Sequence, residues 1–153
     1  MFRTKRTSCP LCGGKRISPK YRITRYNPEF NTDECDECGF IFMNPAFTDE
    51  VIYKFYGEEY YAGKADYSYV DERSIKKFSA YVWDKRISVI HRYVKSGNFL
   101  DVGSSFGGLM ESAEKYYTPY GIELSDYSYA CCAEKFHDRI HHGTLEDHPF
   151  PSS

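Results

Sequence analysis

Three short apolar runs in the last third of the chain alternate with segments long enough for helices. The runs at 98–102, 120–124 and 139–142 each end in a glycine or a polar turn, which is typical of short buried strands. The segments 106–116 and 126–136 between them each suit one helix. Strands that alternate with helices over short connections predict a parallel sheet with right-handed crossovers.

The middle of the chain carries apolar residues at helical spacing. Between positions 71 and 95 they form a stripe of Ile75, Phe78, Val82, Val89 and Tyr93. This stripe predicts an amphipathic helix, and Gly97 follows it where a left-handed cap is expected. A shorter helix is predicted over 49–56, before a tyrosine-rich break near 57–69.

The first part of the chain holds few aliphatic residues and two Cys-x-x-Cys pairs, each followed by glycine. Such pairs form knuckles, and four thiolates satisfy tetrahedral Zn²⁺ with no open position, so the predicted site is structural. A redox pair normally begins a helix, and disulfides need an oxidising compartment; the spacing favours zinc over both. The predicted ligands are Cys9, Cys12, Cys35 and Cys38.

Composition places the 153 residues among globular proteins, with 41% hydrophobic and 27% charged residues. No apolar run reaches membrane-spanning length and no secretory signal opens the chain, so a cytoplasmic protein is expected. The net charge of −2 gives no general argument for nucleic acid. Residues 1–25 are basic without any acid and 29–37 are acidic, which favours a self-neutralised surface over a phosphate-binding face.

The most informative stretch is Asp101-Val102-Gly103-Ser104-Ser105-Phe106-Gly107-Gly108. A turn of glycines and serines between strand and helix lets a ligand approach the backbone and meet the first amides of the helix. Glu123 lies at the end of the next predicted strand, where a carboxylate can take both ribose hydroxyls of an adenosine. A further turn, 143–147, follows the third strand. These elements together predict a nucleoside site at the carboxyl ends of the strands.

In these residues the chain resembles the class I S-adenosylmethionine-dependent methyltransferases. The first motif of that family is Asp/Glu-x-Gly-x-Gly-x-Gly; Asp101, Gly103 and Gly107 match it, and Ser105 replaces the central glycine. The family's Gly-Asp-Ala-Glu-Asp-Leu-Pro-Phe stretch is similar to 143–150, with threonine in place of the aspartate that faces adenine.

The resemblance implies an α/β fold in three parts. A zinc ribbon would cover 1–47, a helical connector or lid 48–97, and the first half of a Rossmann-like doubly wound parallel sheet 98–153. With its Cys-Pro-x-Cys-Gly ribbon and Asn44-Pro45, the chain is similar to zinc-ribbon methyltransferases, which include enzymes acting on nucleotide sugars and other biosynthetic intermediates.

The implied activity is methyl transfer from S-adenosylmethionine to a small biosynthetic acceptor, with this chain carrying the cofactor-binding half. The resemblance assigns the cofactor to Asp101, Gly103, Ser104, Ser105, Gly107, Glu123, Leu124, Thr144 and Leu145. Asp101 and Gly103 would border the methionine end and Glu123 the ribose, with the backbone amide of Leu145 at the adenine. Tyr60 and Tyr61 are candidates for a lid, with ordinary packing as the alternative. No histidine stands in a recognisable catalytic setting.

Two other functions stay open. A nicotinamide dinucleotide site would use Gly103 and Gly108 with Ser105 between them, but Asp101 would repel a pyrophosphate and suits the ammonium of a methionine moiety. A zinc-ribbon module that binds nucleic acid or protein, beside a non-catalytic scaffold, is the second alternative.

A parallel sheet of three strands leaves an open edge and an uncovered apolar face. We therefore expect either a C-terminal remainder of the domain or a second chain to complete it, and we expect the 153 residues alone to be inactive.

Overall fold

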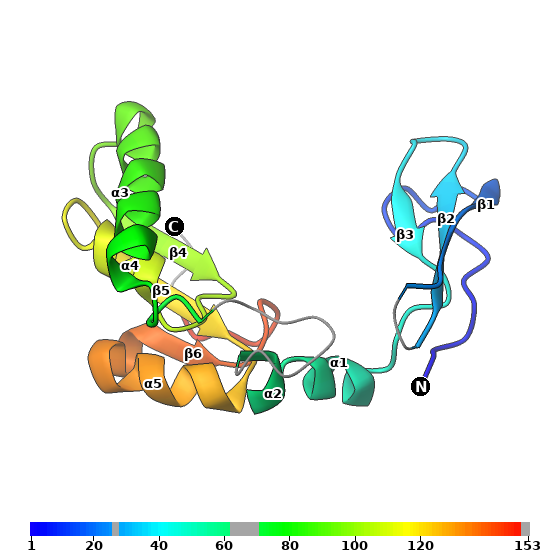
Figure 1. Ribbon diagram of the computed structural model, residues 1–153. Helices are drawn as coiled ribbons and strands as arrows, with labels where there is room; N and C mark the ends of the chain where they lie inside the picture. The colour runs from blue at the N-terminus through cyan, green and yellow to red at the C-terminus, as the bar shows by residue number, and fades with distance from the viewer. Residues whose placement is uncertain (26–27, 62–70, 151–153) are drawn as a thin grey trace. The chain divides into compact units, whose positions relative to one another are not determined.

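The computed structural model describes residues 1–25, 28–61 and 71–150, which belong to two compact units, Met1–Lys54 and Phe55–Ser153. The boundary falls within the short helix α1 (Asp49–Phe55). Figure 1 shows an antiparallel sheet in the first unit and a parallel sheet with helices in the second. No helix in the described ranges is long and apolar enough to cross a membrane.

The first unit is a three-stranded antiparallel sheet with the order β1-β2-β3. Its strands are β1 (Ile17–Ile23), β2 (Phe30–Cys35) and β3 (Ile41–Met43). Ile17 pairs with Cys35 at one end of the β1–β2 ladder. This pairing holds the second Cys-x-x-Cys pair beside strand β1, which follows the first pair in sequence.

A buried amide ties the N-terminal segment to this sheet. Asn44 is almost fully buried, and its side chain accepts the Arg6 N–H at 2.8 Å and donates to the Arg6 carbonyl at 3.0 Å. The same amide donates to the buried carboxylate of Asp33 at 2.6 Å. Burying a polar group without hydrogen-bond partners costs free energy. The Asn44 amide avoids this cost because its oxygen and its nitrogen both have partners.

The second unit contains a parallel sheet with the order β4-β5-β6. Its strands are β4 (Asn98–Val102), β5 (Thr118–Glu123) and β6 (Ile140–His142). Helix α4 (Gly108–Ala113) joins the first two, and α5 (Asp126–Phe136) with the 3₁₀ turn η1 (His137–Arg139) joins the last two. The predicted α/β class, with an N-terminal cysteine-bearing sheet followed by a strand–helix–strand–helix–strand unit, is confirmed.

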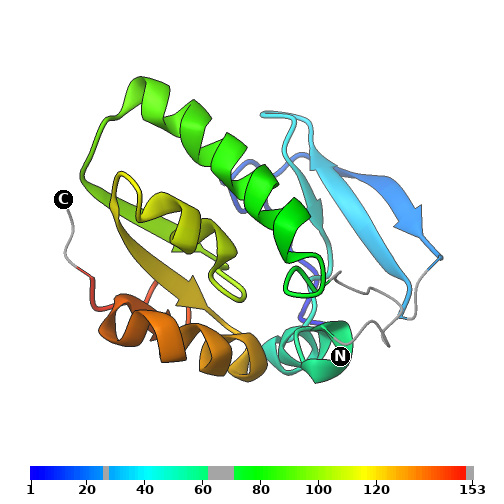
Figure 2. The same cartoon turned by 60° about the vertical axis from the view of Figure 1, so that its left-hand side comes forward.

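Helices α3 (Lys76–Tyr93), α4 and α5 share one side of this sheet (Figure 2). One core cluster joins α4 and α5 to β6 through Met110, Cys132, Phe136 and Ile140. A second joins α3 to α4 through Ile87, Ala113 and Tyr117, with Phe99 of β4 packed against it. A Cβ on Gly121 would lie 2.6 Å from both Ile140 Cδ1 and Met110 Sδ, so the helix layer needs glycine there to reach the sheet.

The apolar stripe of α3 faces away from the described core. Amphipathic helices normally turn such a stripe inward. Here Phe78 is 66% exposed and Tyr93 82% exposed, whereas Ile87, outside the stripe, is 1% exposed. The helix itself is confirmed, but contacts with Ala113 and Tyr117 select its opposite face for the core.

Local conformation also shifts several predicted boundaries. The helix predicted over 106–116 is only α4, because Gly107 is left-handed (φ 79°) and the helix begins after it. The helix predicted from position 71 begins at Lys76. The predicted tyrosine-rich break contains a short helix, α2 (Glu58–Tyr61), and its residues 62–69 lie outside the described residues.

Candidate functional site

The four predicted metal ligands form one cluster in the first unit. Their sulfurs all lie within 4.8 Å of one another, with Cys9 and Cys38 at 3.8 Å and Cys12 and Cys35 at 3.7 Å. A tetrahedron with Zn–S bonds of about 2.3 Å has sulfur–sulfur edges of roughly 3.8 Å. The cluster therefore has the size of a structural zinc site.

The two knuckles repeat the same backbone geometry. Gly13 N–H donates to the Cys9 carbonyl at 3.0 Å, and Gly39 N–H donates to the Cys35 carbonyl at 2.8 Å. Both glycines are left-handed, with φ of 76° and 74°, which explains why each pair is followed by glycine. In the first knuckle, Leu11 N–H points at the Cys9 sulfur at 3.4 Å.

These amides help ionise the sulfurs. Burial raises the pKa of Cys9, but backbone N–H groups of Cys12 and Leu11 outweigh it and lower that pKa to about 7. The Phe40 amide lowers the pKa of Cys38, yet the neighbouring sulfurs raise it to about 12. Four thiolates so close together require a cation, which is the chemistry that Zn²⁺ supplies.

The basic face of the first unit is largely paired with the acids that follow it in sequence. Five of its cations form ion pairs: Arg3 with Asp49, Lys5 with Asp33, Arg16 with Glu37, Lys20 with Glu34 and Arg22 with Glu29. These pairs reduce the positive charge available to a phosphate backbone.

In the second unit, three residues of the loop after β4 have a left-handed backbone. Gly103 and Gly107 are left-handed with φ of 79°, and Ser105 between them is left-handed as well (φ 50°). The serine that departs from the glycine pattern thus keeps a glycine-like backbone, at a cost of about 1 kcal/mol. The amides of Gly103 and Ser104 both donate to the Ile122 carbonyl, at 2.8 and 3.0 Å, so the loop is held against β5.

Glu123 connects this loop to the end of β5. The residue is 4% exposed, and its carboxylate accepts the Ser105 N–H at 2.7 Å and the Ser125 N–H at 2.8 Å. Each carboxylate oxygen can accept a second hydrogen bond. The Ser105 Oγ is buried and has no hydrogen-bond partner among the described residues, which leaves a polar group for a ligand beside Glu123.

Three carboxylates influence one another here. Asp101, near the end of β4, has its pKa raised to about 6 by burial and by the charges of Glu72 and Glu123. Glu72, just before α3, is 8% exposed and accepts the Trp83 indole N–H at 3.0 Å. This acidic group, defined as Asp101, Glu72 and Glu123, favours a cationic ligand.

Aromatic side chains pack against the same loop. The Tyr61 ring lies 5.2 Å from Phe106 and 5.9 Å from Tyr127, between ring centroids, and its hydroxyl accepts a hydrogen bond from Ser128. Burial raises the pKa of Tyr60 and of Tyr61, and the charge of Glu123 adds to both shifts. The two predicted lid tyrosines therefore lie near the end of β5.

The remaining predicted cofactor residues lie at the carboxyl ends of β5 and β6. The Leu124 carbonyl is 3.3 Å from His142 Nε2, and Gly143 N–H donates to the Glu123 carbonyl at 3.0 Å. Thr144 instead bonds within its own turn, donating its N–H to Asp147 at 2.7 Å, and Leu145 is exposed. The structure thus joins the first two loops through Glu123 and places the third beside them.

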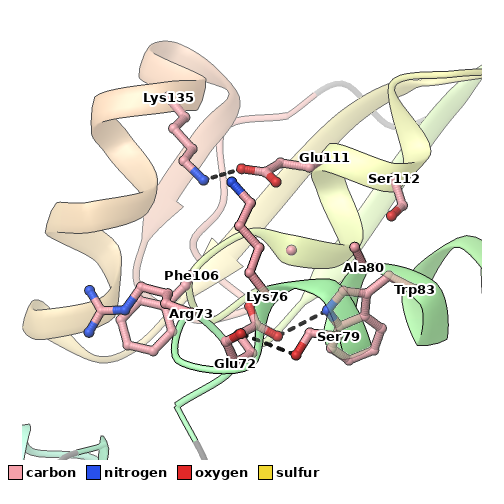
Figure 3. Close-up of a pocket in the computed structure, with 11 residues that line it drawn as sticks. Glu72, Arg73, Lys76, Ser79, Ala80, Trp83, Phe106, Glu111, Ser112 and Lys135 are labelled. Atoms are coloured by element: carbon pink, nitrogen blue, oxygen red, sulfur yellow. Dashed lines mark hydrogen bonds and ion pairs between the residues drawn. The ribbon is translucent and has the colours of Figure 1, made fainter.

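A cavity of about 280 Å³ opens on the helix side of the loop (Figure 3). Glu72, which belongs to the acidic group, lines it together with Phe106 and Trp83. At its other end Lys76 extends toward the ion pair of Glu111 and Lys135. The predicted cofactor residues are not among the described residues that line this cavity.

Glu72 and Phe106 were not among the predicted site residues. Phe106 lies inside the loop motif, and a large aromatic residue among glycines and serines was the sequence feature that could have marked it as a site residue. Glu72 lies far from the motif in sequence, and only the fold brings it to Gly108, where a Cβ would be 2.8 Å from the Glu72 carboxylate.

Comparisons with known proteins give no family for this chain. A scan against family models and a search of curated proteins both find no match.

Proposed function

We propose that the parallel-sheet unit binds S-adenosylmethionine and that the protein takes part in methyl transfer to a small biosynthetic acceptor, such as a nucleotide sugar or a related intermediate. The observation that carries this proposal is the Glu123 carboxylate, which is buried and bonded to Ser105 in the glycine loop. A carboxylate at the end of the second strand, with free lone pairs and a buried hydroxyl beside it, suits a ribose diol.

Charge favours this ligand over a dinucleotide. S-adenosylmethionine carries a sulfonium and an ammonium, and both would be attracted by Asp101, Glu72 and Glu123. A pyrophosphate in the same loop would meet three carboxylates, and the pKa of one of them, Asp101, is raised by burial and by the charges of the other two.

The aromatic packing supports the same ligand. Tyr61, Phe106 and Tyr127 pack against one another near the acidic group. The Arg73 guanidinium already lies 3.9 Å from the centre of the Phe106 ring, so this aromatic cluster accepts an organic cation. Aromatic faces attract organic cations by about 0.5–2 kcal/mol each, more where water is excluded. Tyr60 and Tyr61 would then help to exclude water from the sulfonium.

In this proposal the residues of the chain act by binding and orientation. The bound cofactor supplies an electrophilic methyl group. Asp101 would hold the ammonium and Glu123 the ribose, which fixes the direction of the methyl group for in-line attack by an acceptor. No general base is assigned.

We also propose that the cysteine cluster binds one Zn²⁺ with a structural role. The supporting observation is that four sulfurs within 4.8 Å leave no open coordination position.

Isothermal titration of the zinc-loaded protein with S-adenosylmethionine, S-adenosylhomocysteine and NAD⁺ tests the cofactor proposal. We expect both adenosyl ligands to bind and NAD⁺ not to bind. Glu123→Gln should weaken both adenosyl ligands at least tenfold. Glu134→Gln is the matched control, since Glu134 is exposed on α5, and it should leave affinity unchanged. Absence of adenosyl binding, or equal losses in both variants, would contradict the proposal.

A further inference from the structure

The cavity of about 280 Å³ on the helix side of the loop is built by helices rather than by the sheet. Its lining residues come from α3 and the turn before it, from α4, from α5 and from Phe106 of the loop, and no described strand contributes to the lining. The cavity therefore does not depend on what pairs with the open edges of the parallel sheet. It is also separate from the predicted cofactor residues, which do not line it.

One end of the cavity is aromatic. Phe106 and Trp83 both line it, and a guanidinium lies over each ring. Arg73 is 3.9 Å from the centre of the Phe106 ring, and Arg86 is 4.6 Å from that of Trp83. Ligand pockets usually measure about 300–1,000 Å³, so this volume suits a molecule with one ring rather than a dinucleotide. The aromatic end offers flat apolar surface to such a ring.

The other end of the cavity carries an excess of positive charge. Lys76 extends toward the ion pair of Glu111 and Lys135 (Figure 3). Lys76 itself forms no ion pair with any residue of the described ranges. Two ammonium groups thus meet one carboxylate, and both members of the ion pair are partly exposed. An anion that enters here would be attracted by a net positive charge that solvent can reach.

The acidic residues of the lining preserve this difference between the two ends. Glu111 is paired with Lys135. Glu72 is 8% exposed and accepts the Trp83 indole N–H at 3.0 Å, at the aromatic end. An anionic group beside Glu72 would be repelled, whereas an uncharged ring there would not. The cavity therefore favours one orientation of a ligand, with its ring at the aromatic end and its negative charge at Lys76.

We propose that this cavity binds a small aromatic phosphate. Its ring contacts Phe106 and Trp83, and the ammonium groups of Lys76 and Lys135 hold its phosphate. A phosphate suits the site better than a carboxylate, because its three terminal oxygens can accept hydrogen bonds from both ammonium groups at once. This ligand is distinct from the proposed cofactor, and its binding is measured in the absence of the cofactor. Failure to bind one ligand is therefore distinguishable from failure to bind the other.

The fluorescence of Trp83 reports directly on this cavity, because Trp83 is the only tryptophan of the chain and lines the cavity. The test titrates the full zinc-loaded protein with phenyl phosphate and, for comparison, with benzyl alcohol, benzylamine and inorganic phosphate. We expect phenyl phosphate to give a saturable change in tryptophan fluorescence, with the same affinity by isothermal titration. The uncharged alcohol, the amine and the phosphate without a ring should each bind roughly tenfold more weakly or worse.

Two pairs of variants locate the site. Lys76→Gln removes an ammonium from the cavity, and Lys77→Gln is the matched control because Lys77 is exposed on the same helix and does not line the cavity. Lys76→Gln should weaken phenyl phosphate binding roughly tenfold, and Lys77→Gln should leave it unchanged. Ala80→Phe fills the cavity and should abolish binding. Ser88→Phe adds the same ring at an exposed position of α3 outside the cavity and should not. Circular dichroism checks that each variant is folded.

Several outcomes would overturn the proposal. Phenyl phosphate that gives neither a saturable fluorescence change nor a heat of binding would do so, as would equal effects within each pair of variants. Benzylamine that binds more tightly than phenyl phosphate would identify a cation as the ligand and Glu72 as its partner. Competition between phenyl phosphate and S-adenosylmethionine would show that the cavity belongs to the cofactor site.

Discussion

The backbone N–H of Ser105 donates to the carboxylate of Glu123 at 2.7 Å, across the gap between the loop after β4 and the end of β5. The second oxygen of the same carboxylate accepts the Ser125 N–H at 2.8 Å. One buried side chain therefore fixes the loops that follow two neighbouring strands, and the shape of the candidate cofactor site depends on it.

Replacing Glu123 by glutamine should destabilise the second unit. The amide can accept at one atom only, so one of the two N–H groups loses its acceptor and faces an NH₂ group. We expect a loss of about 1–3 kcal/mol in the free energy of unfolding, since hydrogen bonds to charged groups fall in that range. Urea denaturation followed by tyrosine fluorescence measures it. Glu134→Gln should stay within about 0.5 kcal/mol of the parent.

The raised pKa of Asp101 predicts a pH-dependent stability. The folded unit keeps a proton on this carboxyl up to about pH 6, whereas the unfolded chain releases it near 3.8. The contribution of Asp101 to stability therefore falls as pH rises from about 4 to about 6 and is constant above. Asp101→Asn should stabilise the protein by roughly 1–2 kcal/mol at pH 8, allowing for partial exposure, and the difference should vanish toward pH 4. Denaturation curves across this range would show a constant difference if the carboxyl were not perturbed.

Two glycines of the loop provide a matched pair. Gly103 and Gly107 have the same φ of 79°, but a Cβ on Gly103 would meet nothing within 4 Å, whereas one on Gly107 would lie 2.6 Å from the Phe136 ring and 2.8 Å from the Cys132 sulfur. Gly103→Ala should cost about 1 kcal/mol for the backbone alone. Gly107→Ala should cost about 3 kcal/mol or more because overpacking is added. Thermal unfolding of the two variants side by side checks the difference; equal losses would mean that packing around Gly107 adapts.

Removing the metal should unfold the first unit and spare the parallel sheet. The only metal-sized cluster in the described part of the chain is the four cysteines, and binding energies on the order of 10 kcal/mol hold such small modules together. We expect one Zn²⁺ per chain by mass spectrometry under native conditions. With a chelator, the amide resonances of β1–β3 should lose their chemical-shift dispersion and move into the random-coil region. Cys35→Ser should act like the chelator, whereas Cys131→Ser, outside the cluster, should retain the metal.

Much of the second unit could be predicted from local signals. The strand at 98–102 and the helix at 126–136 have the predicted bounds, because glycine or polar turns delimit each one. The cysteine cluster was predictable too, since its knuckles are set by short-range spacing. The hydrogen bond between Ser105 and Glu123 was foreseeable as well, because parallel strands end at the same edge of a sheet and bring their following loops together.

Other features depend on contacts that spacing does not encode. The apolar stripe of α3 has helical periodicity, yet Ala113 and Tyr117 pack against the opposite face of the helix. Glu72 lies outside every motif and joins the acidic group only through the packing of Trp83 and Gly108. Long-range packing, rather than propensity, decides both.

The two ends of residues 1–48, the segment that carries the cysteine-bearing sheet, lie side by side. The Met1 carbonyl accepts the Thr48 N–H at 3.0 Å, and the Arg3 N–H donates to Ala46 at 2.8 Å, so the chain enters and leaves the cysteine-bearing sheet through adjacent residues. A module with neighbouring ends can be inserted into a surface loop of an unrelated host without stretching it. Residues 1–48 therefore have the geometry of a module that can be inserted into another protein as one piece.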